Sequence, residues 1–189
     1  NALVWQDRRG DPICDELKQQ GNDDWVLGKT GLKIDTYFSA SKLKWLDREK
    51  PAIAAKLASG EAVIGTIDAY LIYRLTRGSV FASDPTNASR TLLFDIRRNA
   101  WDGDLCAIFD IPQHALPEVR GNDASFGEAA FGTADLAPIL NRPLPICGVM
   151  GDSQASLFAQ RCFEPGMAKV TLGTGSSVLL NIGNELRMA

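Results

Sequence analysis

The apolar positions of this chain follow two patterns that alternate along its length. Apolar residues spaced three and four positions apart predict amphipathic helices, and shorter apolar runs predict strands. The predicted helices begin at Asp11, after Ser39 and at the Asp152 cap, and others span residues 51–59, 68–75 and 103–109. The predicted strands are residues 2–6, 62–66, 92–96, 146–150, 168–172 and 178–182. Helices that alternate with short strands indicate an α/β fold.

The helix after Ser39 shows the clearest separation of apolar and charged positions. Leu43 and Leu46 share one face, while Lys42 and Lys44 lie off that face. This spacing predicts that the leucines face the core and the lysines do not.

Composition and charge exclude several classes of protein. The chain has 189 residues, of which 45% are hydrophobic, so it can bury a core without disulfides. Its 20 basic and 23 acidic residues give a net charge of −3, which provides no electrostatic footprint for nucleic acid. No apolar run reaches about 18 residues, and no signal-peptide pattern is found, so no membrane association is expected.

The cysteines indicate a reducing environment. Four cysteines and a single histidine are scattered without the spacing of a zinc site or a disulfide framework, so no metal-ligating residues are assigned. Cys147 and Cys162 stand among apolar residues and are expected to be small buried side chains. A cytoplasmic location is the expectation.

The first candidate functional feature lies where the apolar run 146–150 meets Gly151 and Asp152. A run without alternation predicts a strand covered on both faces. Asp152 is then expected to cap the following helix, whose dipole stabilises its carboxylate. Open α/β sheets bind ligands at this carboxyl end of their strands.

The second candidate is the sequence TLGTGSS between the last two predicted strands. Glycines allow close approach of the backbone to a ligand, and successive N–H groups at such a turn can hold an anion. Taken alone, the turn could be only a tight hairpin and Asp152 only a helix cap. Together, a carboxylate and a phosphate cradle separated by one helix and one strand suggest phosphoryl chemistry.

These segments resemble the FGGY carbohydrate kinases, in particular the branch that phosphorylates glycerol. The resemblance rests on GDSQASLFAQ and CFEPGMAKVTLGTG. It extends in order through NALVWQDRR, TGLKIDTYFSASKLKWL, GTIDAYLIYRL, DPTNASRTLLF and IPQHALPEVR. It therefore covers nearly the whole chain and is weakest at residues 121–142.

The resemblance implies a ribonuclease-H-like fold of the actin and hexokinase type, with ATP bound between two such domains. Residues 1–164 would be the later part of the N-terminal domain, and residues 165–189 the opening hairpin of the C-terminal domain. The chain lacks an initial Met and both ends look cut. The family's first phosphate hairpin and its adenine pocket would lie outside it, so the fragment alone is expected to be inactive.

The resemblance also implies the site. Asp152 matches the catalytic base, and the loop of Gly173, Thr174 and Gly175 matches the residues that bind ATP phosphates, with Mg²⁺ as the accompanying ion. The polyol-binding positions correspond to Trp5, Tyr37, Asp152 and Ser153. From the residues alone, Trp5 and Tyr37 would be interpreted as core aromatics.

At two positions the chain departs from the pattern of the glycerol branch, so the identity of the polyol that accepts the phosphate is left open. Ser153 replaces a glutamine and Ser177 an aromatic residue of the glycerol branch, so a longer polyol such as erythritol is an alternative. A ketose or aldonate kinase is a second alternative, although TNASRT and DTYFSASK favour the glycerol branch. An actin- or chaperone-like nucleotide-binding module is the alternative without catalysis. A homo-oligomer of the full-length protein is left open.

Overall fold

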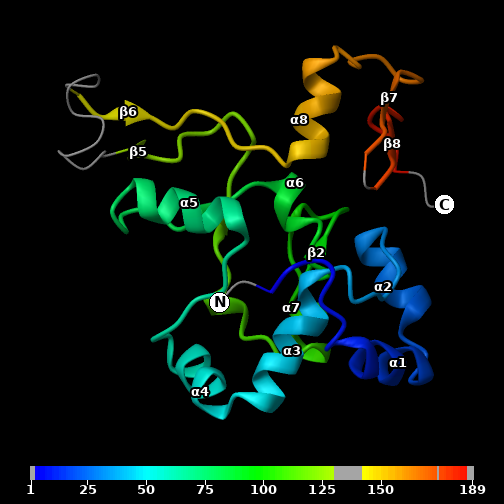
Figure 1. The fold of residues 1–189 in the computed structure, drawn as a ribbon, viewed down its shortest axis with the longest axis vertical. Coiled ribbons are helices and arrows are strands. Elements are labelled where there is room, and N and C mark those ends of the chain that lie inside the picture. The colour runs from blue at the N-terminus through cyan, green and yellow to red at the C-terminus, as the bar shows by residue number, and fades with distance from the viewer. Residues whose placement is uncertain (1–2, 130–141, 174, 187–189) are drawn as a thin grey trace. The chain divides into compact units, whose positions relative to one another are not determined.

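The computed structural model describes residues 3–129, 142–173 and 175–186, and divides into two compact units (Figure 1). The larger unit is Asn1–Val149 and the smaller is Met150–Ala189. The predicted domain boundary after residue 164 stays a prediction.

Seven α-helices are described in the larger unit. Their bounds are α1 Asp11–Gln19, α2 Asp23–Thr30, α3 Ser39–Glu49, α4 Pro51–Ser59, α5 Ile67–Leu75, α6 Pro85–Ala88 and α7 Gly103–Ile108, with a 3-10 turn at Gln113–Ala115. The expected helix 51–59 is confirmed, and Gly60 ends it with a φ of 78°, a left-handed conformation that glycine adopts without a steric penalty. None of the helices in the described parts of the chain is long and apolar enough to cross a membrane.

The described strands of this unit are two residues long and pair in twos. β1 Ala82–Ser83 pairs in parallel with β4 Glu118–Val119. The antiparallel pairs are β2 Phe94–Asp95 with β3 Ala100–Trp101, and β5 Glu128–Ala129 with β6 Leu144–Pro145. Helices and loops therefore provide most of the packing here.

The principal core lies among α1, α2, α3 and α7. Its buried side chains are Ile13, Cys14, Leu17, Val26, Ile34, Ala40, Leu92, Leu93, Leu105, Cys106, Phe109 and Ile111. Leu43 of α3 packs against this core as its spacing predicts, and Trp45 joins it, whereas Leu46, the other predicted core residue, is half-buried. A separate cluster of Ile72, Ala82 and Phe126 joins α5 to β1 and to the segment before β5.

A buried ion pair ties α2 to α7. The ammonium group of Lys29 donates to both carboxylate oxygens of Asp102, each at 2.7 Å, and Asp102 is almost fully buried. The same carboxylate caps α7 by accepting a hydrogen bond from the backbone N–H of Leu105. The predicted cap at Asp102 is confirmed.

The smaller unit consists of one helix and one hairpin. α8 spans Asp152–Ala159, and β7 Ala168–Thr171 pairs antiparallel with β8 Ser177–Leu180. α8 packs against both strands. The two predicted strands of this region are confirmed to within a few residues.

Several predicted strands are wrong in the described residues. Trp5 and Gln6 form a turn in which the N–H of Asp7 donates to the carbonyl of Val4. Residues 62–66 form no strand: the N–H of Ile64 donates to the carbonyl of Ala115, but that of Ala62 donates back to Lys56, and the carbonyl of Thr66 accepts from Tyr70 of α5. The expected strand 92–96 is reduced to the two residues of β2.

The run 146–150 is also not a strand. It is extended, but only Ile146 and Val149 pack against the second cluster, whereas Cys147 is exposed. The segment is thus only partly buried, and the expectation of a buried Cys147 is wrong. Cys162 is buried as predicted.

The two lysines of α3 are buried, contrary to the amphipathic interpretation. Lys42 is 3% and Lys44 is 7% exposed. Each ammonium group donates to backbone carbonyls, and Lys44 also pairs with Asp110 at 2.8 Å. Burial is possible because these acceptors replace water around the charge.

Candidate functional site

The larger unit brings together two of the predicted site residues. Trp5 lies in the turn before α1 and Tyr37 in the turn before α3, with ring centroids 5.7 Å apart and planes inclined by 50°. The two residues are 58% and 51% exposed. Interpreting them as core aromatics is therefore wrong for the described chain, and their rings form an exposed aromatic surface.

The loop that carries Tyr37 is held by hydrogen bonds from its own backbone and from Lys42 of α3. Tyr37 donates its N–H to the carboxylate of Asp35 at 2.7 Å. The ammonium group of Lys42 donates to the carbonyl oxygens of Thr36, Tyr37 and Phe38. Burial lowers the pKa of Lys42 from its usual value.

The segment that follows Trp5 is held by charged groups. Arg9 bonds the carboxylate of Asp7 and lowers the pKa of that group to about 2. The guanidinium of Arg9 also lies over the ring of Trp45 in α3, 4.4 Å from its centroid. The segment with Trp5 and the helix behind Tyr37 are thereby connected by a cation–π contact.

The polar segment around α6 forms a buried junction. Asp84 is fully buried and accepts hydrogen bonds from Thr86 N, Asn87 Nδ2 and Asn122 Nδ2. Asn122 also donates to the carbonyl of Val149 at 2.9 Å. The spacing of Asp before Pro, Thr and Asn is typical of a helix cap, but the partner Asn122 is distant in sequence and carries no local signal.

In the smaller unit, Asp152 is the first residue of α8 and the cap position is Gly151. The prediction of Asp152 as the cap is thus wrong by one position. Asp152 is exposed, and one of its oxygens accepts the N–H of Ser153 at 2.7 Å. It still lies in the first helical turn, where the helix dipole favours a negative charge.

The glycine turn lies between β7 and β8. Gly173 and Gly175 are exposed, and Thr174 lies outside the described residues. A Cβ atom built on Gly175 would meet nothing within 4 Å, and one on Gly173 would meet only the carbonyl oxygen of Gly175, at 3.7 Å. The backbone here is open to a bound group, which fits the expected phosphate cradle.

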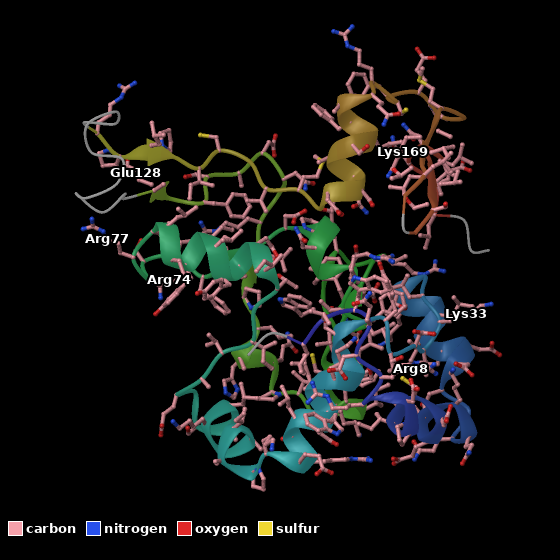
Figure 2. The ribbon with its side chains drawn as sticks, in the orientation of Figure 1. Arg8, Lys33, Arg74, Arg77, Glu128 and Lys169 are labelled. Atoms are coloured by element: carbon pink, nitrogen blue, oxygen red, sulfur yellow. The ribbon has the colours of Figure 1, made fainter. Side chains whose placement is uncertain are left out.

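Lys169 of β7, labelled in Figure 2, is a further polar residue beside the turn that the sequence did not single out. It is 2% exposed, and its ammonium group donates to Thr171 Oγ1 at 2.7 Å and Ser177 Oγ at 3.4 Å. Thr171 and Ser177 are paired across the hairpin. The signal is the period of two: Lys169 and Thr171 share one face of the strand, next to the turn.

The predicted residues therefore fall into two groups. Trp5 and Tyr37 are in contact in the larger unit, whereas Asp152, Ser153, Gly173 and Gly175 all belong to the smaller one. Among the described residues, no three His, Cys, Asp or Glu side chains come together as a metal site. A single carboxylate such as Asp152 still fits Mg²⁺, which usually binds through one or two carboxylates, phosphates and water.

Known proteins resemble this chain over nearly its whole length. The glycerol kinase of Methylobacterium nodulans is 50% identical over 184 residues, which are 97% of this chain and 36% of that one. The crystal structure of Plasmodium falciparum glycerol kinase with ADP matches with a TM-score of 0.88 and 41% identity, covering 95% of this chain and 35% of that one. The gluconate kinase of Lactobacillus acidophilus shares the fold, with a TM-score of 0.80 at 20% identity and coverage of 94% and 35%.

The chain thus spans about a third of the length of the relatives it matches. The expected α/β fold of the actin and hexokinase type is confirmed by the structural matches. Residues 1–159 match the N-terminal domain of one family. The chain belongs to the FGGY family of carbohydrate kinases.

Proposed function

We propose that this chain forms part of an ATP-dependent kinase that converts glycerol to glycerol 3-phosphate. The observation that carries the proposal is the exposed contact between Trp5 and Tyr37, in segments whose relatives are glycerol kinases. An exposed aromatic face suits the C–H edge of a small polyol, and a phenol hydroxyl can bond one of its oxygens.

Asp152 is the group that receives the proton. The hydroxyl oxygen of the polyol attacks the γ-phosphorus of ATP, the bond from that phosphorus to the bridging oxygen breaks, and ADP leaves with the electron pair. The proton of the attacking hydroxyl passes to the Asp152 carboxylate. A positioned base of this kind contributes about 10²–10⁴-fold to the rate.

The phosphate groups would be held by the turn between β7 and β8. Backbone N–H groups of Gly173, Thr174 and Gly175 would serve as donors, and buried Lys169 adds a positive charge next to the turn. Mg²⁺, when bound with the nucleotide, would supply positive charge beside the phosphate oxygens. Residues 1–164 would supply the polyol side of the site and residues 165–189 the phosphate side.

The acceptor preference depends on Ser153 and Ser177. The hydroxyl of Ser177 already accepts a hydrogen bond from Lys169, so it serves the hairpin and need not bind a further substrate hydroxyl. Glycerol is thus favoured over erythritol. One additional carbon in a pocket without a matched partner changes kcat/KM by about 10- to 200-fold.

The test is kcat/KM of the full-length protein for glycerol, erythritol, xylitol and a ketose, with ATP as the donor. Preference for glycerol supports the proposal, and phosphorylation of none of them contradicts it. The Ser153→Gln, Ser177→Phe double variant is the specificity control. A wild type that prefers erythritol, with the double variant returning to glycerol, would favour the longer polyol.

We place this enzyme in the cytoplasm. The four cysteines, Cys14, Cys106, Cys147 and Cys162, are all free thiols, which suits a reducing compartment. Fractionation of cells with an antibody to the native protein tests the assignment, and recovery from an oxidising compartment would contradict it.

A further inference from the structure

Lys42 is a buried charge whose hydrogen-bond acceptors, within the described residues, all lie in one loop. It lies in α3, is 3% exposed, and makes no ion pair with a carboxylate among the residues that the structure describes. Its acceptors are the carbonyl oxygens of three consecutive residues, Thr36, Tyr37 and Phe38, the last two at 3.3 and 3.1 Å. An ammonium group has three donors, so the loop matches its full bonding capacity.

Burial of the Lys42 charge lowers the stability of the fold unless the loop gains order from it. Burying a charge costs several kcal/mol when its partners are imperfect, and a leucine or methionine at this position of α3 would pack without that cost. Three successive carbonyls that turn inward also leave the Tyr37 side chain on the outer side, where it is 51% exposed and contacts Trp5. The ammonium group therefore fixes the direction of the Tyr37 ring through the backbone.

We propose that Lys42 is a positioning residue for the polyol site. It holds the backbone of residues 36–38 so that Tyr37 stays against Trp5, and it does not touch the substrate itself. The polyol assignment rests on the proposed function, whereas the ordering of the loop does not.

Lys44 of the same helix provides a matched control. It is also buried, but its ammonium group bonds the carbonyl of Ile108 at 2.6 Å and the carboxylate of Asp110 at 2.8 Å. It makes no described contact with the loop of Tyr37. Substitution of either lysine therefore removes a buried charge from α3, but only substitution of Lys42 removes hydrogen bonds to the loop of Tyr37.

The experiment compares Lys42→Met and Lys44→Met in the full-length protein. KM for glycerol, KM for ATP and kcat are measured with the thermal midpoint of unfolding. Lys42→Met is expected to raise KM for glycerol by about 10- to 100-fold, because small displacements of a positioning group have effects of that size. KM for ATP stays within about twofold, and Lys44→Met lowers the midpoint without changing KM for glycerol.

A double-mutant cycle with Tyr37→Ala shows whether Lys42 acts through Tyr37. The effect of Lys42→Met on KM for glycerol should largely disappear in the Tyr37→Ala background, because interacting residues are not additive. Full additivity, or an equal rise of both KM values, would overturn the proposal. If Lys42→Met does not fold, Lys42→Gln replaces it in the same cycle.

Hydrogen exchange separates this inference from the proposed function. Amide exchange at residues 37 and 38 should be faster in Lys42→Met than in Lys44→Met, whatever the substrate is. A wild type inactive on every polyol but with this difference would refute the function and keep the ordering role. Equal exchange in the two variants would refute the role of Lys42.

Discussion

Gly10 and Ser41 pack so closely that a methyl group on Gly10 would lie 2.7 Å from the hydroxyl oxygen of Ser41. Gly10 is the cap position of α1, and Ser41 lies in the first turns of α3. The absence of a side chain at Gly10 thus lets the start of α1 lie directly on α3. Trp5 precedes α1 and Tyr37 precedes α3, so this contact joins the two helices that follow the aromatic residues.

Gly10→Ala should therefore destabilise the protein by about 1–3 kcal/mol, the usual range for overpacking. Gly28→Ala is the matched control, because a Cβ there would meet nothing within 4 Å and the residue lies within α2. That control is expected to stabilise by up to about 1 kcal/mol through helix propensity. Urea unfolding measures both, and equal effects would argue against the close contact.

Tyr37→Phe should weaken polyol binding while leaving the stack with Trp5 in place. Loss of one hydrogen bond of about 0.5–1.5 kcal/mol predicts a rise in KM for glycerol of roughly 2- to 12-fold. Tyr70→Phe on α5 removes the hydroxyl of another exposed tyrosine and should leave KM unchanged. KM for glycerol is measured by steady-state kinetics at saturating ATP. An unchanged KM in Tyr37→Phe would show that the Tyr37 hydroxyl does not bind the polyol.

Asp152→Asn keeps the shape of the side chain but removes the proton acceptor. We expect kcat to fall by about 10²–10⁴-fold with dissociation constants for ATP and glycerol nearly unchanged. Glu164→Gln neutralises a different exposed carboxylate of the same unit and should keep the wild-type rate. If Asp152→Asn retained more than about a tenth of the wild-type kcat, Asp152 would not be the base.

The ion pair of Lys29 and Asp102 should make stability depend on pH. Burial alone would raise the pKa of Asp102, but hydrogen bonds from Lys29 and Leu105 outweigh it, and the pKa lies below its usual value. A lowered carboxyl pKa stabilises the fold above the unfolded value near 3.9 and loses that effect as the pH falls. The free energy of unfolding should therefore decline as the solution is acidified below about pH 5.

Lys29, the basic partner of this ion pair, makes stability depend on pH in the alkaline range, with the opposite sign. Burial opposes the charge of Lys29, yet Asp102 and Asp104 raise its pKa, so this contribution is present below about pH 10 and is lost as the pH rises through the folded value. Asp102→Asn should cost about 3–5 kcal/mol at pH 7 and flatten the acid decline. Asp104→Asn, at an exposed carboxylate, should cost at most about 1 kcal/mol.

The sequence predicted what depends on local spacing. Residues that start or end helices, such as Pro51, Gly60 and Asp102, predicted the helix 51–59 and the cap of α7. Two short apolar runs around a glycine turn predicted the hairpin at Gly173. The family resemblance singled out Trp5 and Tyr37 as polyol-binding residues. Their rings are in contact, and the polyol-binding role stays a prediction.

What the sequence could not predict depends on distant partners. Lys42 and Lys44 have the helical spacing of solvated residues, but both are buried. The acceptors of Lys42 are carbonyls of the preceding loop, and those of Lys44 are the Ile108 carbonyl and the Asp110 carboxylate, which are distant in sequence. Residues 146–150 look like a strand covered on both faces, but Ile146 and Val149 are only partly buried and Cys147 is exposed. The burial of Asp84 likewise requires Asn122, which has no local relation to it.

The three carbonyls around Lys42 form the kind of oxygen cradle that proteins use to bind free alkali cations. Here the cation is covalently attached to α3, so it cannot dissociate or be exchanged. Sodium and potassium levels should then have no influence on the order of the Tyr37 loop. An enzyme built in this way would keep its acceptor site formed through large changes in the ionic composition of the cell.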